Sequence, residues 1–461
     1  MIEVTPELLT RHDRPGPRYT SYPTAVEFTE AFGPDEYAER LAAAARRPGQ
    51  PLSLYVHLPF CEARCSFCAC HVVVTRRSEV SDAYLGRVVA EAALIAERLG
   101  DRRLLVQYHW GGGTPTYYPP HVLVELHRGL LEKFELADDA EVAIEVDPRV
   151  TTAAHLEALV DLGFNRVSLG VQDLDPEVQR LIGRNQTEEQ TVALYRDARR
   201  LGFKSINFDL VYGLPGQDEG TLHRTLDTVL TLRPDRLAVY SFAFVPWMRP
   251  HQRRLDQALL PGTEQKFALL AAVVSRLTGA GYRHIGIDHF ALPGDELARS
   301  AAAGTLNRNF MGYTTKRDTE MVALGTSGIS DVDGAYAQNH RRLASYYQDV
   351  DEGRLPIERG YLLDRDDKLR RYVITELMCN GVVDLAAAAS RFQVSGPEVF
   401  AAEIESLSSP GGLVEEGMVT IEGSTVRATE LGMLFVRRLA SVFDVHTARR
   451  SDDRPVFSKT I

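Results

Sequence analysis

Cysteine, long apolar runs and excess positive charge are all scarce in this chain of 461 residues. Only five cysteines occur, and four of them lie within residues 61–70, which is unlike a disulfide framework and indicates a metal site. The most apolar helical stretch, residues 267–277, is about half as long as a membrane span. The N-terminus carries charges throughout and has no apolar leader. We therefore expect a cytoplasmic protein without a membrane partner.

The charge balance excludes one class of partner. The formal net charge is −11, from 63 acidic and 52 basic residues. Proteins that bind nucleic acid usually present a basic surface, so we expect no nucleic-acid partner. Hydrophobic residues make up 44% and charged residues 25%, which is typical of a soluble globular protein. We expect a monomer with a sizeable core.

From residue 52 onward, short apolar runs alternate with helical patterns. Strands are expected at 52–58, 105–110, 142–147, 166–170, 205–213 and 237–242, with helices between them near 79–98, 120, 152–162, 186–202, 218–231 and 263–279. This alternation indicates a parallel sheet. Six such units without a GxGxxG motif favour an α/β fold of the partial (β/α)₆, TIM-like barrel type over a doubly wound sheet. In such barrels the chemistry lies at the carboxyl ends of the strands.

Composition suggests three parts: an N-terminal extension (residues 1–50), the barrel with additions on the substrate side (51–350) and a mainly helical C-terminal domain (351–461). Residues 288–350 interrupt the alternation, and we expect them to cover one side of the barrel. Near the C-terminus, a hairpin pattern at 418–428 is followed by a helical one at 429–442. That ending is similar to a small winged-helix-like domain.

The cysteines Cys61, Cys65 and Cys68 have the spacing C-x₃-C-x₂-C. Three thiolates can bind three irons of a [4Fe–4S] cubane and leave the fourth iron open. An open iron is what chelation of the amine and carboxylate of S-adenosylmethionine (SAM) requires, and electron transfer would then yield a 5′-deoxyadenosyl radical. The alternative is zinc, which typically needs a second cysteine pair or distant histidines. Cys70 could be a fourth ligand, a proton donor or a spectator, whereas Cys379 fits a buried helical position.

Polar residues and glycines follow several strands. The run at 111–116 (GGGTPT) is a candidate SAM-binding loop or a tight turn. Glu145 and Gln172 end strands, where a carboxylate could accept from a ribose hydroxyl or an ammonium group. Asp209 lies in an apolar strand and needs a partner, either a ligand hydroxyl or an arginine. Arg184 could bind a carboxylate or simply be solvated.

His57 and His109 lie in strands, where core histidines with satisfied hydrogen bonds are the usual finding. Neither is therefore expected to be a ligand.

Eight segments resemble, in the same order, those of the oxygen-independent coproporphyrinogen III oxidases (coproporphyrinogen dehydrogenases), radical SAM enzymes of haem biosynthesis. They are RYTSYPT (18–24), YVHLPFC with its cysteines (55–70), HWGGGTPTY (109–117), IEVDPR (144–149), FNRVSLGVQD (164–173), FDLVYGLPGQ (208–217), GIDHFA (286–291) and RNFMGYTT (308–315). The resemblance covers nearly the whole chain.

The resemblance implies a [4Fe–4S] cluster and two SAM molecules per chain. It implies oxidative decarboxylation of two propionate side chains of coproporphyrinogen III to vinyl groups, giving protoporphyrinogen IX, with an electron donor protein that stays unidentified. The residues implied to contact the first SAM are Tyr55, Gly112, Glu145 and Ile329. Those implied to contact the second are Phe67, Gly113, Thr114, Gln172, Arg184, Asp209 and Ala243.

Catalytic roles are expected for Tyr55 and for Cys70, which in the family is important without ligating the cluster. The substrate has four carboxylates, so a local basic lining is expected. The candidates are Arg18, Arg76, Arg77 and Lys316.

Three alternative functions differ from this one in sequence. The related haem chaperones usually lack the Cys-x-Cys extension that ends here at Cys70, and carry an HNxxYW motif where this chain has NFMGYTT at 309–315. Two-SAM radical methyltransferases and cyclopropanases lack segments like 18–24 and 308–315. A DNA-binding regulator is disfavoured by the acidic charge.

Overall fold

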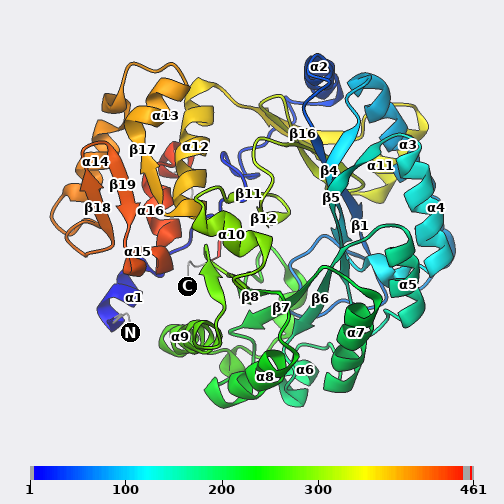
Figure 1. Cartoon of the computed structure of the whole chain (residues 1–461), viewed down its shortest axis with the longest axis horizontal. Helices are drawn as coiled ribbons and strands as arrows, with labels where there is room; N and C mark the ends of the chain where they lie inside the picture. Colours follow the sequence, from blue (N-terminus) through cyan, green and yellow to red (C-terminus); the bar gives the residue numbers. More distant parts are fainter. Residues whose placement is uncertain (1–4, 450–456, 459–461) are drawn as a thin grey trace.

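The computed structural model describes residues 5–449 and 457–458, and is built around one large mixed sheet (Figure 1). Its strand order is β16-β15-β14-β13-β1-β4-β5-β6-β7-β8-β10-β9. The parallel strands at its centre are β1 (Leu52–Leu58), β4 (Leu104–Gly112), β5 (Glu135–Val146), β6 (Arg166–Gln172), β7 (Ser205–Tyr212) and β8 (Arg236–Ser241). The predicted run of six parallel strands, and with it the partial barrel, is confirmed.

Helices connect these strands and lie around the outside of the sheet (Figure 1). They are α3 (Ser78–Leu99), α4 (Pro120–Leu131), α5 (Ala153–Asp161), α6 (Pro176–Leu181), α7 (Glu188–Leu201) and α8 (Glu219–Leu232), followed by α9 (Thr263–Gly279). Local sequence sets their ends. For example, Thr187 caps α7 by accepting from the Gln190 amide, and Gly202 ends it in the left-handed conformation.

Part of the segment at 288–350, which is predicted to cover one side of the barrel, extends the sheet at its two ends, and its covering role stays a prediction. Beyond β8 lie β10 (His289–Ala291) and β9 (Arg283–Ile285), and beyond β1 lie β13 (Glu320–Leu324), β14 (Ile329–Val332), β15 (Ala335–Asn339) and β16 (Ile357–Leu362). β13 pairs with β1 in parallel, placing Leu52 opposite Glu320. The remaining elements of this stretch are α10 (Glu296–Ala302), β11 (Asn307–Asn309), β12 (Gly312–Thr314) and α11 (Leu343–Asp351).

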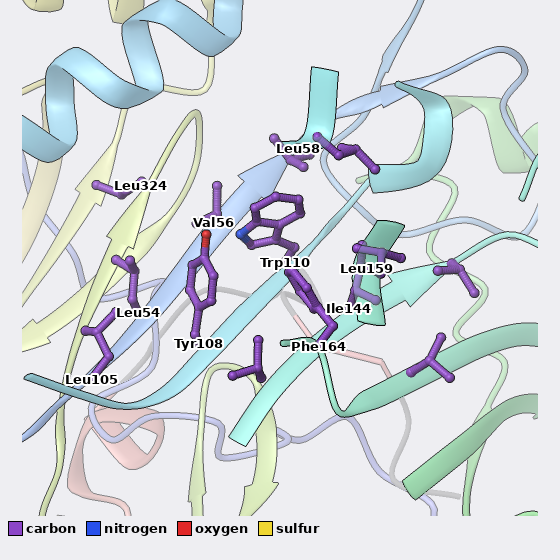
Figure 2. Close-up of a cluster of buried hydrophobic side chains, with 14 of the residues drawn as sticks. Leu54, Val56, Leu58, Leu105, Tyr108, Trp110, Ile144, Leu159, Phe164 and Leu324 are labelled. Atoms are coloured by element: carbon purple, nitrogen blue, oxygen red, sulfur yellow. The ribbon is translucent and has the colours of Figure 1, made fainter. Parts of the chain in front are cut away.

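The main core lies between the sheet and its outer helices (Figure 2). Tyr108 and Trp110 of β4 and Phe164 are fully or almost fully buried there, and the rings of Trp110 and Phe164 meet edge to face at 5.0 Å between centroids. Leu54 and Val56 of β1 extend the same cluster. Each large apolar side chain buried in this way contributes roughly 1.5–3 kcal/mol. The core therefore stiffens the strands whose ends carry the polar residues.

A buried carboxylate fixes the loop between β13 and β14. Glu91 of α3 accepts hydrogen bonds from the Gly325 amide (2.8 Å), the Asn339 side chain (2.6 Å) and the Tyr346 hydroxyl (2.6 Å). Burial raises the pKa of Glu91 to about 7, although these three donors oppose the shift. Below, the Glu91 cluster means these four residues.

The C-terminal part forms a second core together with the N-terminal extension. Leu9, Tyr19 and Tyr22 pack there against apolar residues of the C-terminal helices. The N-terminal elements are α1 (Pro6–His12) and α2 (Pro34–Ala45); the C-terminal ones are α12 (Arg365–Asn380), β17 (Val382–Asp384), α13 (Leu385–Arg391), α14 (Ala401–Ser408), β18 (Val419–Glu422), β19 (Thr425–Ala428), α15 (Glu430–Leu434), α16 (Val436–Val442) and α17 (Val445–Arg449). The expected hairpin and the helical segment after it are thus present.

The division into parts at residues 50 and 350 stays a prediction. Strand β16 lies beyond residue 350 and is nevertheless paired with β15 in the large sheet. The ends of the predicted extension and C-terminal domain (1–4, 450–456 and 459–461) lie outside the described residues. None of the helices in the described ranges has the length and apolar character that a membrane crossing demands.

Candidate active site

A cavity of about 470 Å³ opens at the carboxyl ends of the central strands. Its lining brings together most of the residues singled out from the sequence. They are Cys61, Phe67, Gly112, Gly113, Thr114, Glu145, Gln172, Arg184, Asp209 and Ala243, together with Cys65, Cys68 and Cys70. These residues come from six different strand ends and loops, as expected for a barrel site.

The three predicted cluster ligands line one wall of this cavity, and none is in a disulfide. Cys61 ends the short strand β2 (Phe60–Cys61), and its sulfur lies 3.4 Å from the Thr114 hydroxyl. Burial raises the pKa of the Cys61 thiol to about 11. Cys65 is buried. The chain therefore presents three thiols from one short loop to a shared space.

Two guanidinium groups face the Cys65 sulfur. Arg184 Nη1 lies 3.6 Å and Arg149 Nη2 lies 3.7 Å from Cys65 Sγ. The Asp147 carboxylate pairs with both arginines, at 3.2 Å from Arg184 and 2.6 Å from Arg149. Arg184 is 6% exposed and also donates to the Gly170 carbonyl, so the solvated alternative for this residue was wrong. Arg149 and Asp147 were not selected from the sequence, although both lie in the IEVDPR segment.

This donor set fits a [4Fe–4S] cluster. Thiolates are the ligands of such clusters, and hydrogen bonds to sulfur together with nearby positive charge stabilise the negative charge that they carry. Within the described residues, no three His, Cys, Asp or Glu side chains come close enough to hold one metal ion. A zinc ion would need such a group, whereas a cubane takes each thiolate at a different iron.

The glycine loop after β4 approaches its neighbours too closely for side chains. A Cβ atom on Gly113 would lie 2.5 Å from the Pro59 carbonyl oxygen, and one on Gly112, whose φ is +117°, would lie 2.6 Å from the His57 ring. The Gly112 amide donates to Glu145 at 3.1 Å. The loop thus brings bare backbone to the cavity wall.

Glu145 is the second-last residue of β5 and has two protein donors. Besides the Gly112 amide, His109 Nε2 lies 3.3 Å from its carboxylate. Burial alone would raise the pKa of Glu145, but His109 and the Gly112 amide hold it below its usual value. His109, expected to be a core histidine, therefore contacts a cavity residue. His57 matches the expectation better, because it is buried and its Nε2 lies 3.0 Å from the His71 carbonyl oxygen.

Of the two partners that the sequence suggested for Asp209, the arginine is wrong, and the ligand hydroxyl stays a prediction. The Asp209 carboxylate accepts from the Ser168 hydroxyl (2.7 Å) and from the Asn207 side chain (2.9 Å), and no arginine is bound to it among the described residues. Burial raises the pKa of Asp209 to about 6. On the neighbouring strand, Gln172 lies in the left-handed region with φ 68°, next to a register shift between β6 and β7. Such strain is commonly found at binding sites.

Two predicted site residues do not line the cavity as it is described. Tyr55 lies on β1 beneath it, with its hydroxyl 3.1 Å from His57 Nδ1 and its ring stacked on His109. Ile329 begins β14 and packs with Phe28 and Tyr336. Their predicted contacts with SAM stay predictions.

The predicted basic residues divide between the cavity and the surface. Arg18 lines the cavity and pairs with the buried carboxylate of Asp288. Arg76 lines an adjoining cavity of about 200 Å³ next to Cys61. Arg77 and Lys316 are outside the linings of both.

Comparisons with known proteins agree over nearly the whole chain. The model of the Radical SAM superfamily matches residues 55–229, and that of the HemN C-terminal domain matches residues 363–435. The oxygen-independent coproporphyrinogen III oxidase of Escherichia coli K12 is 43% identical over 444 residues, 96% of either chain. That of Synechocystis is 37% identical over 464 residues, 100% of this chain and 98% of the relative. The solved structure of coproporphyrinogen III oxidase (HemN) from Escherichia coli superposes with a TM-score of 0.89 at 42% identity, covering 93% of this chain and 97% of the other.

Proposed function

Since the chain belongs to the family of oxygen-independent coproporphyrinogen III oxidases, in the radical SAM superfamily, we propose that it decarboxylates two propionate side chains of coproporphyrinogen III to vinyl groups. The family implies a [4Fe–4S] cluster and SAM. When bound, they supply a 5′-deoxyadenosyl radical, which takes a hydrogen atom from the β-carbon of a propionate. One observation carries the proposal. Free thiols, a bare glycine loop and strand-end carboxylates meet in one cavity of about 470 Å³.

The residues that would hold the cluster are Cys61, Cys65 and Cys68. Arg149 and Arg184 would donate to the Cys65 sulfur and so stabilise the added charge when an electron arrives. Cys70 lies two residues further on and faces the cavity, so it would meet the substrate rather than the iron. We assign to its Sγ the role of holding or giving a proton during turnover. Tyr55 supports this region from below through His57 and His109.

Three carboxylates line the cavity, and because Asp147 pairs with Arg149 and Arg184, we assign the other two, Glu145 and Asp209, to the two SAM molecules. Glu145 has a lowered pKa and stays charged at neutral pH, which suits the ammonium or ribose of the first SAM, with Gly112 and Ile329. Asp209 would take the ribose hydroxyls of the second SAM, with Gln172 and Arg184 beside it. The second molecule would also meet Phe67, Gly113, Thr114 and Ala243.

The substrate carboxylates need cations at the cavity. We assign this role to Arg18, which is supported by its position in the cavity lining and by its having Asp288 as its only acidic partner among the described residues. After hydrogen abstraction, the propionate carbon radical would lose CO₂ and pass one electron to an external one-electron acceptor, which leaves a vinyl group. The protein's part in this step is to orient the side chain and exclude water.

The direct test is an anaerobic assay of cluster-loaded protein with SAM, a strong reductant and coproporphyrinogen III, with products followed by mass. We expect two successive losses of CO₂ per substrate and one 5′-deoxyadenosine for each. SAM cleavage without decarboxylation would overturn the assigned substrate and favour a methyltransferase-type reaction. No cleavage by protein with a full cluster would favour the haem-carrier alternative.

A further inference from the structure

Residues 245–254 form a turn and a short 3₁₀ helix (Pro250–Arg254) that contact the cysteine loop. His251 Nε2 lies 2.8 Å from the Cys68 carbonyl oxygen, and the Gln252 side chain donates to the Phe67 carbonyl at 3.3 Å. Gln252 is fully buried and also donates to the Ala243 carbonyl, while accepting from the Val245 amide at 2.6 Å. The segment is therefore anchored, and its outer side is one hydrogen bond away from a predicted cluster ligand.

The outer side of this segment carries exposed apolar and basic side chains. Trp247 is 50% and Met248 is 48% exposed, which places them among the most exposed large apolar residues described. Arg253 and Arg254 are exposed, and Arg249 is half-buried. We call these five residues the Trp247 surface. Trp, Met and Arg are the side chains enriched at protein interfaces.

The Trp247 surface is basic in an acidic protein. No Asp or Glu occurs between residues 236 and 255, although the chain as a whole has a net charge of −11. Among the described residues, no carboxylate lies within ion-pair distance of Arg249, Arg253 or Arg254. The charges of Arg64, Arg249 and Arg254 all act on His251, so Arg64 of the cysteine loop adds to the same field.

These residues serve something other than the cavity. None of the five belongs to the cavity lining, so they are not placed to bind SAM or substrate. They lie next to the predicted cluster site, because His251 and Gln252 of the same segment contact the Cys68 and Phe67 carbonyls. An apolar centre with a basic rim is complementary to an acidic protein.

We propose that the Trp247 surface docks a small acidic protein that carries one electron at low potential and delivers it to the cluster past Cys68. This proposal rests on the proposed function, since it assumes a cluster at the three cysteines. Each SAM consumed takes up one electron: the carrier is oxidised by one electron, and the C–S bond of SAM breaks to give methionine and the 5′-deoxyadenosyl radical. Electron-transfer encounters use small interfaces that are steered by charge, which suits a surface of this size.

The test uses a purified acidic [2Fe–2S] ferredoxin as the probe, because plant-type ferredoxins have potentials near −400 mV. Binding to the full-length protein is measured by calorimetry at low and high salt, and reduction of the cluster by reduced ferredoxin is followed by absorbance. The variant is Arg253→Glu with Arg254→Glu. The matched control is Arg128→Glu with Arg196→Glu, exposed residues of α4 and α7 that also lack an ion-pair partner among the described residues.

We expect the Arg253/Arg254 variant to bind ferredoxin at least about tenfold more weakly than the wild type at low salt, and its cluster to be reduced correspondingly slowly. Raising the salt concentration should lower the affinity of the wild type for ferredoxin until it approaches that of the variant. The control pair changes the net charge of the protein by the same amount, and its affinity for ferredoxin should stay within about twofold of the wild-type value. Turnover with dithionite, a small reductant that needs no docking, should be unchanged in both. The variant Arg253→Gln with Arg254→Gln removes the two charges without reversing them, so it should lose less affinity for ferredoxin than the charge-reversed variant.

Three results would overturn the proposal. The two charge-reversed pairs could weaken ferredoxin binding equally, which would make the effect one of net charge. Dithionite-driven turnover could fall together with the ferredoxin-driven rate, which would place the segment in the cluster site itself. A concentration-dependent dimer that the Arg253/Arg254 variant dissolves would assign the surface to a second copy of this chain. Ferredoxin binding is measured without turnover. The binding comparison therefore tests this proposal even if the decarboxylation assay fails.

Discussion

Two buried carboxylates of the barrel differ in how completely the protein satisfies them. Glu91 is fully buried behind the sheet, and three donors occupy its two oxygens. Asp209 lines the cavity, and each of its oxygens accepts a single hydrogen bond from a neutral side chain. Both have a raised pKa, about 7 for Glu91 and about 6 for Asp209.

The raised pKa therefore does not separate the two regions, because burial causes it in both. Unused acceptor capacity does separate them, since a carboxylate offers about four acceptor positions. The Glu91 carboxylate uses three of its acceptor positions to hold the β13–β14 loop and its neighbours. Asp209 uses two, and its remaining acceptor positions are available to a ligand in the cavity. We expect the first to matter for stability and the second for binding.

The largest effect on activity should appear when a cysteine of the cavity, Cys65, is compared with a cysteine of the buried core, Cys379. Cys65→Ser removes a predicted cluster ligand from the cavity wall, so we expect iron content to fall and SAM cleavage to drop below detection. Cys379 is buried in an apolar cluster on α12, and Cys379→Ala should keep iron and activity at a cost of about 1 kcal/mol in unfolding free energy. Iron analysis and the deoxyadenosine assay measure both. A full iron complement in Cys65→Ser would contradict the assignment.

The next effect sharpens the comparison directly. Asp209→Asn removes a charge from the cavity without changing the side-chain volume, so SAM affinity should fall about tenfold to a hundredfold while stability is kept or increased. The folded pKa is raised above that of the unfolded chain, so Asp209 lowers the wild-type free energy of unfolding as pH rises from about 4 to 6. The variant should lack this contribution. Calorimetric SAM binding and urea unfolding at pH 4, 5 and 6 test both parts, and unchanged SAM affinity would break the comparison.

A smaller effect is expected among the basic residues. Arg18→Ala removes a cavity guanidinium and should raise KM for the porphyrinogen about tenfold with a smaller change in kcat. Lys316→Ala, outside the cavity lining, is the control and should leave both within about twofold. Steady-state kinetics with saturating SAM distinguish them. An equal rise in KM for both variants would mean that the substrate extends well beyond the described cavity.

The smallest effect on activity should come from Glu91→Gln, although its effect on stability is large. A glutamine places an amide donor among three donors, so the free energy of unfolding should fall by about 1–3 kcal/mol. The folded pKa of about 7 lies above that of the unfolded chain, so the wild type should lose stability between about pH 4.5 and 7, and the variant should not. Activity at low temperature should stay within about threefold. A loss of SAM affinity as large as that of Asp209→Asn would remove the distinction between the two carboxylates.

The central fold was predictable because periodicity is a local property. The runs at 52–58 and 205–213 read as strands from their apolar residues alone, and the parallel order followed from the helices between them. The strands around 320–362 were missed for the opposite reason. β13 is five residues long and is held in the sheet by pairing with β1, which lies far away in the sequence. β14 and β15 are four and five residues long, and they join the sheet only through β13 and through each other.

Site residues were predictable where they belong to a sequence motif, and less so where tertiary packing determines which side chains meet. The cysteines, Glu145 and Asp209 follow from spacing and strand position. Arg149 was missed because an arginine in a strand-end segment looks solvated until the fold turns it onto the Cys65 sulfur. The Glu91 cluster joins α3 to α11, to β15 and to the loop between β13 and β14, and no local sequence pattern predicts contacts between segments so far apart in the chain.

The pairing of β1 with β13 also sets the order of events on the ribosome. Leu52 is opposite Glu320, so one edge of the first strand stays unpaired until the chain has been made past residue 324. At about 5–20 residues per second, that is a wait of many seconds during which an apolar strand edge is open to other nascent chains. Strands β1 to β8 can pair in order as the chain emerges from the ribosome. The strand that covers the free edge of β1 is β13, which lies in the last third of the sequence. Truncation before residue 320 should therefore yield aggregates rather than a smaller barrel.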